Sequence, residues 1–234
     1  SLFTATSASC VTGLIVADTW LQWSLFGQTV ILVMIQLGGL GFMTVITLFS
    51  LALHRRIGLS ERLVMVSTLN LNDMDGVVRM VQHALMGTFC MEGAGALLLS
   101  LRFIPKFGLA GGLWRGVFHG VSAFCNAGFD LMGSEVPYSS LTAYGADPLV
   151  CVTVALLIIV GGIGFSTWQD IAGNGCRLRQ YRLQSKLILL TTFLLLLAGT
   201  LYFACYEFRL PQWADMDPGE RVLAAFFQSA SPRT

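Results

Sequence analysis

The chain has 234 residues, of which 55% are hydrophobic and only 12% are charged, whereas about a quarter of the residues in an ordinary soluble protein are charged. This composition nearly excludes a soluble domain, and the net charge of +1 leaves no basic surface for nucleic acid. The sequence therefore predicts a protein of the lipid bilayer that does not bind nucleic acid.

Four long stretches carry almost no charge, and about 20 apolar residues are enough to cross roughly 30 Å of hydrocarbon. In chain order these candidate spans are Thr19–Leu53, Met80–Leu101, Leu149–Gln169 and Leu187–Tyr206. Three further apolar segments are too short to cross, namely Leu2–Val16, Gly116–Phe129 and Val222–Pro232. Non-spanning backbone survives in a bilayer only where protein buries it or where it lines a water-filled cavity. The short segments therefore indicate re-entrant helices around a pore.

Basic residues fix the expected orientation. They gather between spans one and two and between spans three and four: Arg55, Arg56, Arg62 and Arg79, then Arg177, Arg179, Arg182 and Lys186. The positive-inside rule puts both loops in the cytoplasm. The three short apolar segments then enter the membrane from the outer side.

An internal repeat links these segments. Residues 2–14 (LFTATSASCVTGL) align without gaps with residues 117–129 (VFHGVSAFCNAGF), and a weaker third copy runs over residues 225–234 (AFFQSASPRT). The span after each of the first two copies contains a second motif, GGLGF at 38–42 and GGIGF at 161–165. Two motifs repeated in the same order predict a unit of span, short helix, glycine loop and span.

Such a unit suits ion permeation, because rings of backbone carbonyls behind short pore helices can replace the hydration shell of a cation. Only glycine adopts the required backbone conformations without strain, and the C-terminal end of a pore helix points its negative dipole at the site. The pore helices expected are Leu2–Ser9, Gly116–Phe124 and Val222–Ser231.

The stretches TATSASCVTGL, IQLGGLGF, FHGVSAFCNAGFDL, GGIGF and FFQSASPRT together resemble the Trk/Ktr/HKT superfamily of potassium transporters. The resemblance covers essentially the whole chain. It implies an all-α polytopic membrane protein in which span–pore helix–filter loop–span units stand in a pseudo-fourfold arrangement. We expect an internal fragment of about two and a half repeats: the end of repeat one at 1–62, repeat two at 63–186, and the start of repeat three at 187–234.

The same resemblance implies potassium uptake through a selectivity filter, with potassium as substrate and no cofactor. The coordinating carbonyls would belong to the residues that lead into each filter glycine: Val11 and Thr12 before Gly13, and Asn126 and Ala127 before Gly128. Glycine rather than serine at position 13 favours potassium over sodium. Channel-like flow, proton symport and sodium symport all stay open.

Three acids and two cysteines outside the expected filter also need an interpretation. Asp18 and Asp130 follow the filter glycines and either attract cations at the outer mouth or are solvated rim charges. Glu92 is an intramembrane acid, which is either functional or an acceptor of hydrogen bonds from its neighbours. Cys10 and Cys125 are interpreted as small side chains packed behind the loops.

The resemblance further implies a multi-pass protein of the bacterial inner membrane, a homodimer and a cytosolic nucleotide-binding regulatory subunit. The alternatives are a non-conducting scaffold or sensor, a sodium-selective transporter and a membrane-embedded enzyme. An enzyme is not expected, since the chain has only three His, no His-Glu-x-x-His motif and one acid within the candidate spans.

Overall fold

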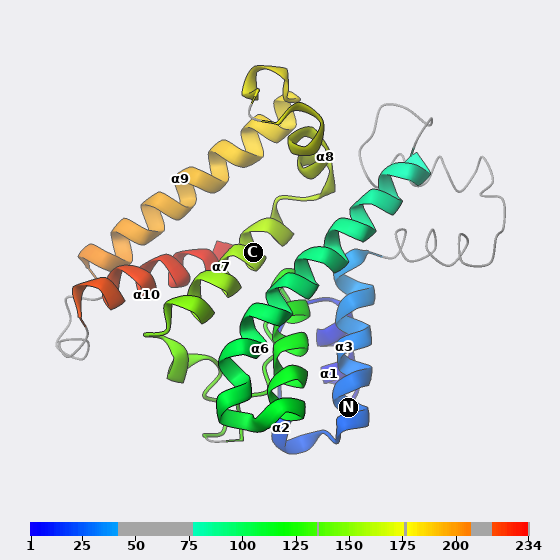
Figure 1. The fold of residues 1–234 in the computed structure, drawn as a ribbon, viewed down its shortest axis with the longest axis vertical. Coiled ribbons are helices and arrows are strands. Elements are labelled where there is room, and N and C mark those ends of the chain that lie inside the picture. The colour runs from blue at the N-terminus through cyan, green and yellow to red at the C-terminus, as the bar shows by residue number, and fades with distance from the viewer. Residues whose placement is uncertain (42–76, 135, 176, 207–216, 234) are drawn as a thin grey trace.

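The structure, a computed structural model, describes residues 1–41, 77–134, 136–175, 177–206 and 217–233. Within these ranges the chain forms helices and turns but no strand, as expected for an all-α membrane protein. The helices are α1 (Leu2–Ser9), α2 (Thr19–Gln22), α3 (Leu25–Leu40), α6 (Val77–Phe124), α7 (Pro148–Gly162), α8 (Phe165–Asn174), α9 (Leu183–Cys205) and α10 (Pro218–Ala230), with 3-10 turns at Thr142–Tyr144 (η1), Leu178–Gln180 (η2) and Ser231–Arg233 (η5) (Figure 1).

Two helices in the described ranges are long and apolar enough to cross a membrane, α6 from Gln82 onward and α9. Helices α7 and α8 meet the same criterion as a pair, but they are bent by 97° at the break between them. The expected span Leu149–Gln169 corresponds to this bent pair, because α7 ends at Gly162 and Gly164 has a φ of +80°. Residues 42–76, which include the end of the expected first span and Arg55, Arg56 and Arg62, lie outside the described residues.

Helix α6 consists of two arms that fold back on each other (Figure 1). The turn is at Gly108, whose φ of +74° and ψ of 170° are not helical, and Pro105 precedes it by three residues. Proline lacks a backbone N–H and weakens the helix at this point. The second arm is the expected second pore helix, and it begins several residues before the predicted start at Gly116.

A stripe of glycines lets the two arms of α6 approach closely. A Cβ atom at Gly112 would lie 2.5 Å from the backbone of Ile104, and one at Gly116 would lie 2.0 Å from Ser100 Oγ. A Cβ at Gly120, one turn further on, would lie 3.1 Å from the Ala96 nitrogen. Small residues four apart replace side-chain packing with backbone contact, as they do in membrane helix pairs.

Helices α9 and α10 form a second hairpin of the same kind (Figure 1). A Cβ at Gly199 of α9 would lie 2.3 Å from Ser229 Oγ of α10, and this hydroxyl donates to the Leu196 carbonyl at 3.0 Å. Helix α10 covers the expected third pore helix, Val222–Ser231, apart from its last residue. As in α6, a long apolar helix is thus followed by a shorter one that packs back against it.

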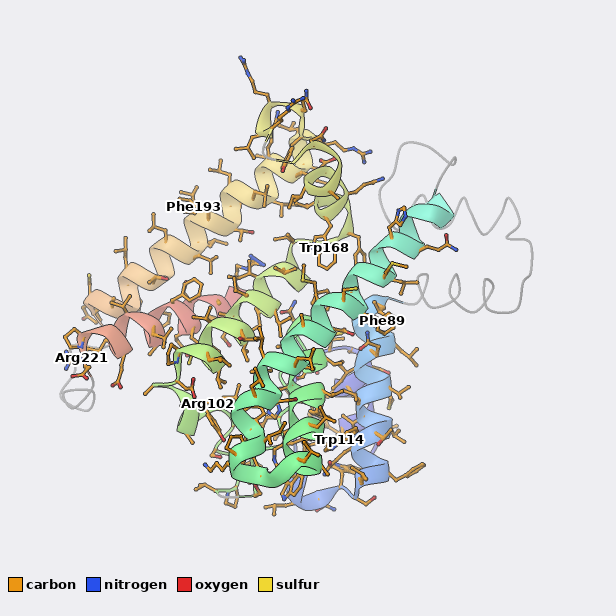
Figure 2. The ribbon with its side chains drawn as sticks, viewed as in Figure 1. Phe89, Arg102, Trp114, Trp168, Phe193 and Arg221 are labelled. Atoms are coloured by element: carbon orange, nitrogen blue, oxygen red, sulfur yellow. The ribbon has the colours of Figure 1, made fainter. Side chains whose placement is uncertain are left out.

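Buried side chains form one core that includes residues of α1, α3, both arms of α6, α7 and the loop that follows α6. The largest fully buried ones include Phe103 and Phe118 of α6, Ile35 of α3 and Val150 of α7. On α9, by contrast, Phe193 is 62% exposed and lies on the outer side of the helix (Figure 2). The core therefore supports the loops that follow the pore helices.

The turn from α8 to α9 is closed by one buried acid, Asp170. Its Oδ2 atom accepts hydrogen bonds from the Arg182 backbone N–H at 3.0 Å and from Ser185 Oγ at 2.6 Å. The Arg182 guanidinium also lies 3.7 Å from Oδ1, with half of its side chain exposed. Asp170 therefore connects the end of the bent pair to the start of the next span.

We expect Asp170→Ala to lower the free energy of unfolding by about 1–3 kcal/mol, because the Arg182 N–H and the Ser185 hydroxyl lose their acceptor. Arg182→Ala removes only an exposed ion pair and should cost less than about 1 kcal/mol. Melting temperatures of the two detergent-purified variants measure this difference. Equal losses would show that the ion pair, not the buried acceptor, stabilises the turn.

Candidate functional site

Two loops far apart in the sequence have the same backbone conformation. The first follows α1 and the second follows the second arm of α6. The φ angles are +55° at Val11 and +58° at Asn126, and they are +74° at Gly13 and +72° at Gly128. The left-handed region is unusual for a valine, so the match reflects a common geometry imposed at both loops.

The same three backbone hydrogen bonds close each loop onto its helix. In the first, the N–H groups of Cys10, Val11 and Thr12 donate to the carbonyls of Thr6, Ala8 and Ser7 at 2.8, 3.3 and 2.9 Å. In the second, Cys125, Asn126 and Ala127 donate to Val121, Ala123 and Ser122 at 2.9, 3.2 and 2.8 Å. The backbone N–H groups of each loop therefore point toward the end of the preceding helix. This arrangement suits a site built from carbonyl oxygens.

The two loops touch at their glycines. A Cβ atom at Gly13 would lie 2.6 Å from the Ala127 carbonyl oxygen, and one at Gly128 would lie 3.5 Å from the Gly13 Cα. The structure thus places side by side the two loops that contain the six residues expected in the filter, which are Val11, Thr12, Gly13, Asn126, Ala127 and Gly128. Both loops belong to one site.

Serines at matching positions form hydrogen bonds that stabilise the two loops. In the first loop, Thr12 Oγ1 donates to Ser7 Oγ at 2.9 Å. In the second, Ser122 Oγ donates to the Phe129 carbonyl at 2.7 Å. Ser7 and Ser122 occupy the same place in the repeat, so one side chain per unit binds the residues next to the glycine.

The glycine motif of each following span has two separate uses. A Cβ at Gly38 would lie 2.2 Å from the Ser9 carbonyl oxygen, and one at Gly161 would lie 1.9 Å from the Phe124 carbonyl oxygen. Ser9 and Phe124 are the last residues of the two pore helices. Three residues after each of these glycines, Gly41 directly after α3 and Gly164 two residues after the end of α7 have φ angles of +79° and +80°. The first glycine of each motif therefore packs against the end of the preceding short helix, and the last one follows the end of its own helix.

A cavity of about 720 Å³ opens beside the paired loops. Residues of both loops, of α10 and of the segment around η1 line it, among them Thr12, Asn126, Gly128, Asp130, Glu220 and Gln228. The cavity thus opens onto the second loop, next to Asn126 and Gly128.

The two acids expected at the outer mouth differ in their surroundings. Asp18 is only 5% exposed. Its Oδ1 accepts from the N–H groups of Trp20 and Leu21 at 2.9 and 3.2 Å, and its Oδ2 accepts from the Tyr138 N–H at 2.9 Å. Asp18 therefore caps α2 and joins the segments that follow the two loops.

Asp130, by contrast, is half-buried and lines the cavity. Its Oδ1 accepts a hydrogen bond from the Met132 N–H at 3.0 Å. Of the two acids, Asp130 has the position from which a carboxylate can attract cations.

The remaining acid, Glu92, is buried and is bonded to its neighbours. Its carboxylate accepts from the Gln36 side-chain amide at 3.0 and 3.1 Å, and the Cys125 thiol lies 3.7 Å from Oε1. Cys125 itself is buried beside the loop as expected, whereas Cys10 is exposed.

Arg115, which the sequence analysis did not select, is a buried cation next to the site. Its guanidinium lies 3.9 Å from the ring centroids of both Trp20 and Phe107. Its Nε donates to the Leu131 carbonyl at 3.3 Å and its Nη2 to Ser134 Oγ at 3.2 Å. In the sequence, the signal for this residue was a single arginine directly before an apolar segment. In the structure, Arg115 binds the chain that follows the second loop.

Comparison with known proteins connects this geometry to transport. Residues 1–234 match the TrkH family, described as cation transport protein. The chain is 41% identical over 234 residues to the potassium/sodium uptake protein NtpJ of Enterococcus hirae and 39% identical over 235 residues to the Ktr system potassium uptake protein B of Bacillus subtilis. Each alignment covers 100% of this chain but 51% and 52% of the relative. The chain thus spans about half the length of the curated relatives it matches.

Proposed function

Because the chain belongs to the TrkH family of cation transport proteins, we propose that the complete polypeptide is a membrane subunit for potassium uptake. The family is one of ion transporters rather than enzymes, and its members are integral membrane proteins. The names of the two relatives include potassium, and one of them also includes sodium. Potassium is the proposed substrate, and no cofactor is required by the chemistry.

The observation that carries the proposal is the matching backbone conformation of the two touching loops. In the proposed filter, the carbonyls of Val11 and Thr12 and those of Asn126 and Ala127 replace part of the hydration shell of the ion. Two pore helices end at these loops, and the negative ends of their dipoles stabilise a cation there. No side-chain charge has to bind the ion.

The proposed filter belongs to a pseudo-fourfold arrangement of repeats, of which this chain contributes parts at 1–62, 63–186 and 187–234. Two touching loops with the same φ angles and hydrogen bonds support the idea of equivalent units. The boundary at residue 62 lies outside the described residues, and α9 already begins at Leu183, four residues before the proposed third unit.

The proposal includes partners on the cytoplasmic side. A cytosolic nucleotide-binding regulatory subunit would dock near the turn from α8 to α9, where Arg177 and Arg179 are exposed. The complete polypeptide would act as a homodimer in a bacterial inner membrane.

The proposal is tested by expressing the complete polypeptide in a bacterium that lacks its own potassium uptake. Restored growth at low potassium, with rubidium uptake that excess sodium does not inhibit, is the expected result. Inhibition by sodium would favour a sodium-selective transporter. A protein that reaches the membrane but restores neither growth nor uptake would be a non-conducting scaffold or sensor, and the proposal would be wrong.

Asp130→Asn should raise the potassium concentration for half-maximal uptake about two- to fivefold, because it removes a charge beside the cavity. The amide oxygen can still accept from the Met132 N–H, so the maximal rate should stay unchanged. The effect should shrink when uptake is measured at high ionic strength, since salt screens the charge. An unchanged half-saturation at low salt would contradict the assigned place of Asp130.

A further inference from the structure

Glu92 lies outside the two loops, but it contacts the start of the second one. Cys125 is the first residue after the pore helix and stands directly before Asn126, whose φ is +58°. Glu92 Oε1 accepts from the Cys125 thiol, with 3.7 Å between Sγ and Oε1. The position of the Cys125 side chain therefore sets where the loop leaves its helix.

A second helix holds the same cysteine from the other side. A Cβ atom at Gly39 of α3 would lie only 2.4 Å from Cys125 Sγ, so this helix packs directly against the thiol. Three residues earlier on α3, the Gln36 amide donates to both oxygens of Glu92, at 3.0 and 3.1 Å. Glu92, Gln36 and Gly39 thus surround Cys125 with elements of two different units.

The third unit has the same construction with other residues. Arg233 follows α10 at the repeat position of Cys125, and its Nη1 donates to Thr192 Oγ1 of α9 at 3.0 Å. In both units, then, the residue at this repeat position is hydrogen-bonded to the long helix that precedes the pore helix, although Arg233 lies in η5, three residues after the end of α10. This recurrence indicates that anchoring the start of the loop is a general feature of the repeat.

Resting on the proposed function, we propose that Glu92 is a positioning residue of the filter: its carboxylate anchors Cys125 and thereby sets the selectivity of the second loop without touching the ion. Glu92 is only 4% exposed and is not among the described residues that line the cavity. Both of its oxygens already accept hydrogen bonds from protein donors.

Uptake of rubidium and of sodium by the complete polypeptide, each divided by the amount of protein in the membrane, tests this inference. Glu92→Ala and Cys125→Ala should each lower the rubidium-to-sodium ratio about fivefold, the value expected for the loss of one hydrogen bond. A merely structural role would lower the amount of protein and leave the ratio unchanged.

Two conservative variants distinguish the proposed positioning role of Glu92 from a role of its negative charge. In Glu92→Gln, a carbonyl oxygen in the place of Oε1 can still accept from both Cys125 and Gln36, so the ratio should stay within about twofold of wild type. Cys125→Ser keeps a donor and should behave in the same way. Loss of all transport in Glu92→Gln would instead mark Glu92 as a charge in the ion pathway and overturn the inference.

The double variant Glu92→Ala/Cys125→Ala should lower the ratio no further than either single variant, because both remove the same contact. Additive losses would contradict the inference. Should Glu92→Ala fail to reach the membrane, Cys125→Ala and Glu92→Gln still decide the question. If the wild type prefers rubidium and both alanine variants keep this preference, only the role of Glu92 is refuted. If the wild type itself shows no preference for rubidium over sodium, the proposed function is refuted.

Discussion

Gly13→Ser is expected to lower the preference for rubidium over sodium at least about tenfold, which corresponds to about 1.4 kcal/mol. The added Cβ would lie 2.6 Å from the Ala127 carbonyl oxygen, so this proposed ligand must move. The φ of +74° adds strain of about 1–2 kcal/mol for a residue with a side chain. Uptake of each ion by the complete polypeptide, divided by its amount in the membrane, gives the ratio.

Gly41→Ser is the matched control. Gly41 has a φ of +79°, but a Cβ there would meet no atom of the described residues within 4 Å. The substitution therefore also places a side chain at a positive φ, but away from the contact between the two loops, and it should leave the ion ratio unchanged. Equal loss of selectivity in both variants would mean that strain alone, and not contact between the loops, explains the effect.

Gly161→Ala should have the largest effect on folding, with a loss of about 3 kcal/mol or more from overpacking. Its Cβ would lie 1.9 Å from the Phe124 carbonyl oxygen, the last carbonyl of the second pore helix. Neither partner is a flexible side chain, so a helix must shift. The measurement is the fraction of detergent-extracted protein that elutes as a single folded species.

Gly93→Ala is the control for this prediction, because a Cβ at this helical position would meet no atom within 4 Å in the part of the chain that the structure describes. Alanine favours the helix by about 1 kcal/mol over glycine, so this variant should fold at least as well as wild type. Gly38→Ala, at the matching place in the first unit, should fail as Gly161→Ala does. Normal folding of Gly161→Ala would contradict the packing of α7 on the pore helix.

The repeat predicted much of the site from the sequence alone. The gapless match of residues 2–14 with 117–129 placed both glycines in equivalent loops, and the structure gives them equivalent φ angles and hydrogen bonds. The first pore helix was predicted at its observed bounds, Leu2–Ser9. The local sequence pattern was enough to predict these two loops, because each loop is closed by backbone hydrogen bonds to its own helix.

Features that depend on distant partners could not be predicted. Asp18 follows the glycine of the first loop, but one of its hydrogen-bond donors is the backbone N–H of Tyr138, which lies 120 residues further along the chain. The bend at Gly164 is hidden in a uniformly apolar stretch, since composition does not reveal a positive φ. The second pore helix was predicted to start at Gly116, whereas the second arm of α6 already includes Arg115, whose guanidinium lies against two aromatic rings.

The central claim is that the two loops form one binding site for a potassium-like ion. Anomalous diffraction from crystals of the complete polypeptide soaked in rubidium tests it most directly, because the ion itself is located. We expect a peak in direct contact with carbonyl oxygens from both loops, those of Thr12 and Ala127 among them. A transport-active protein whose rubidium peaks all lie away from Gly13 and Gly128 would contradict the claim.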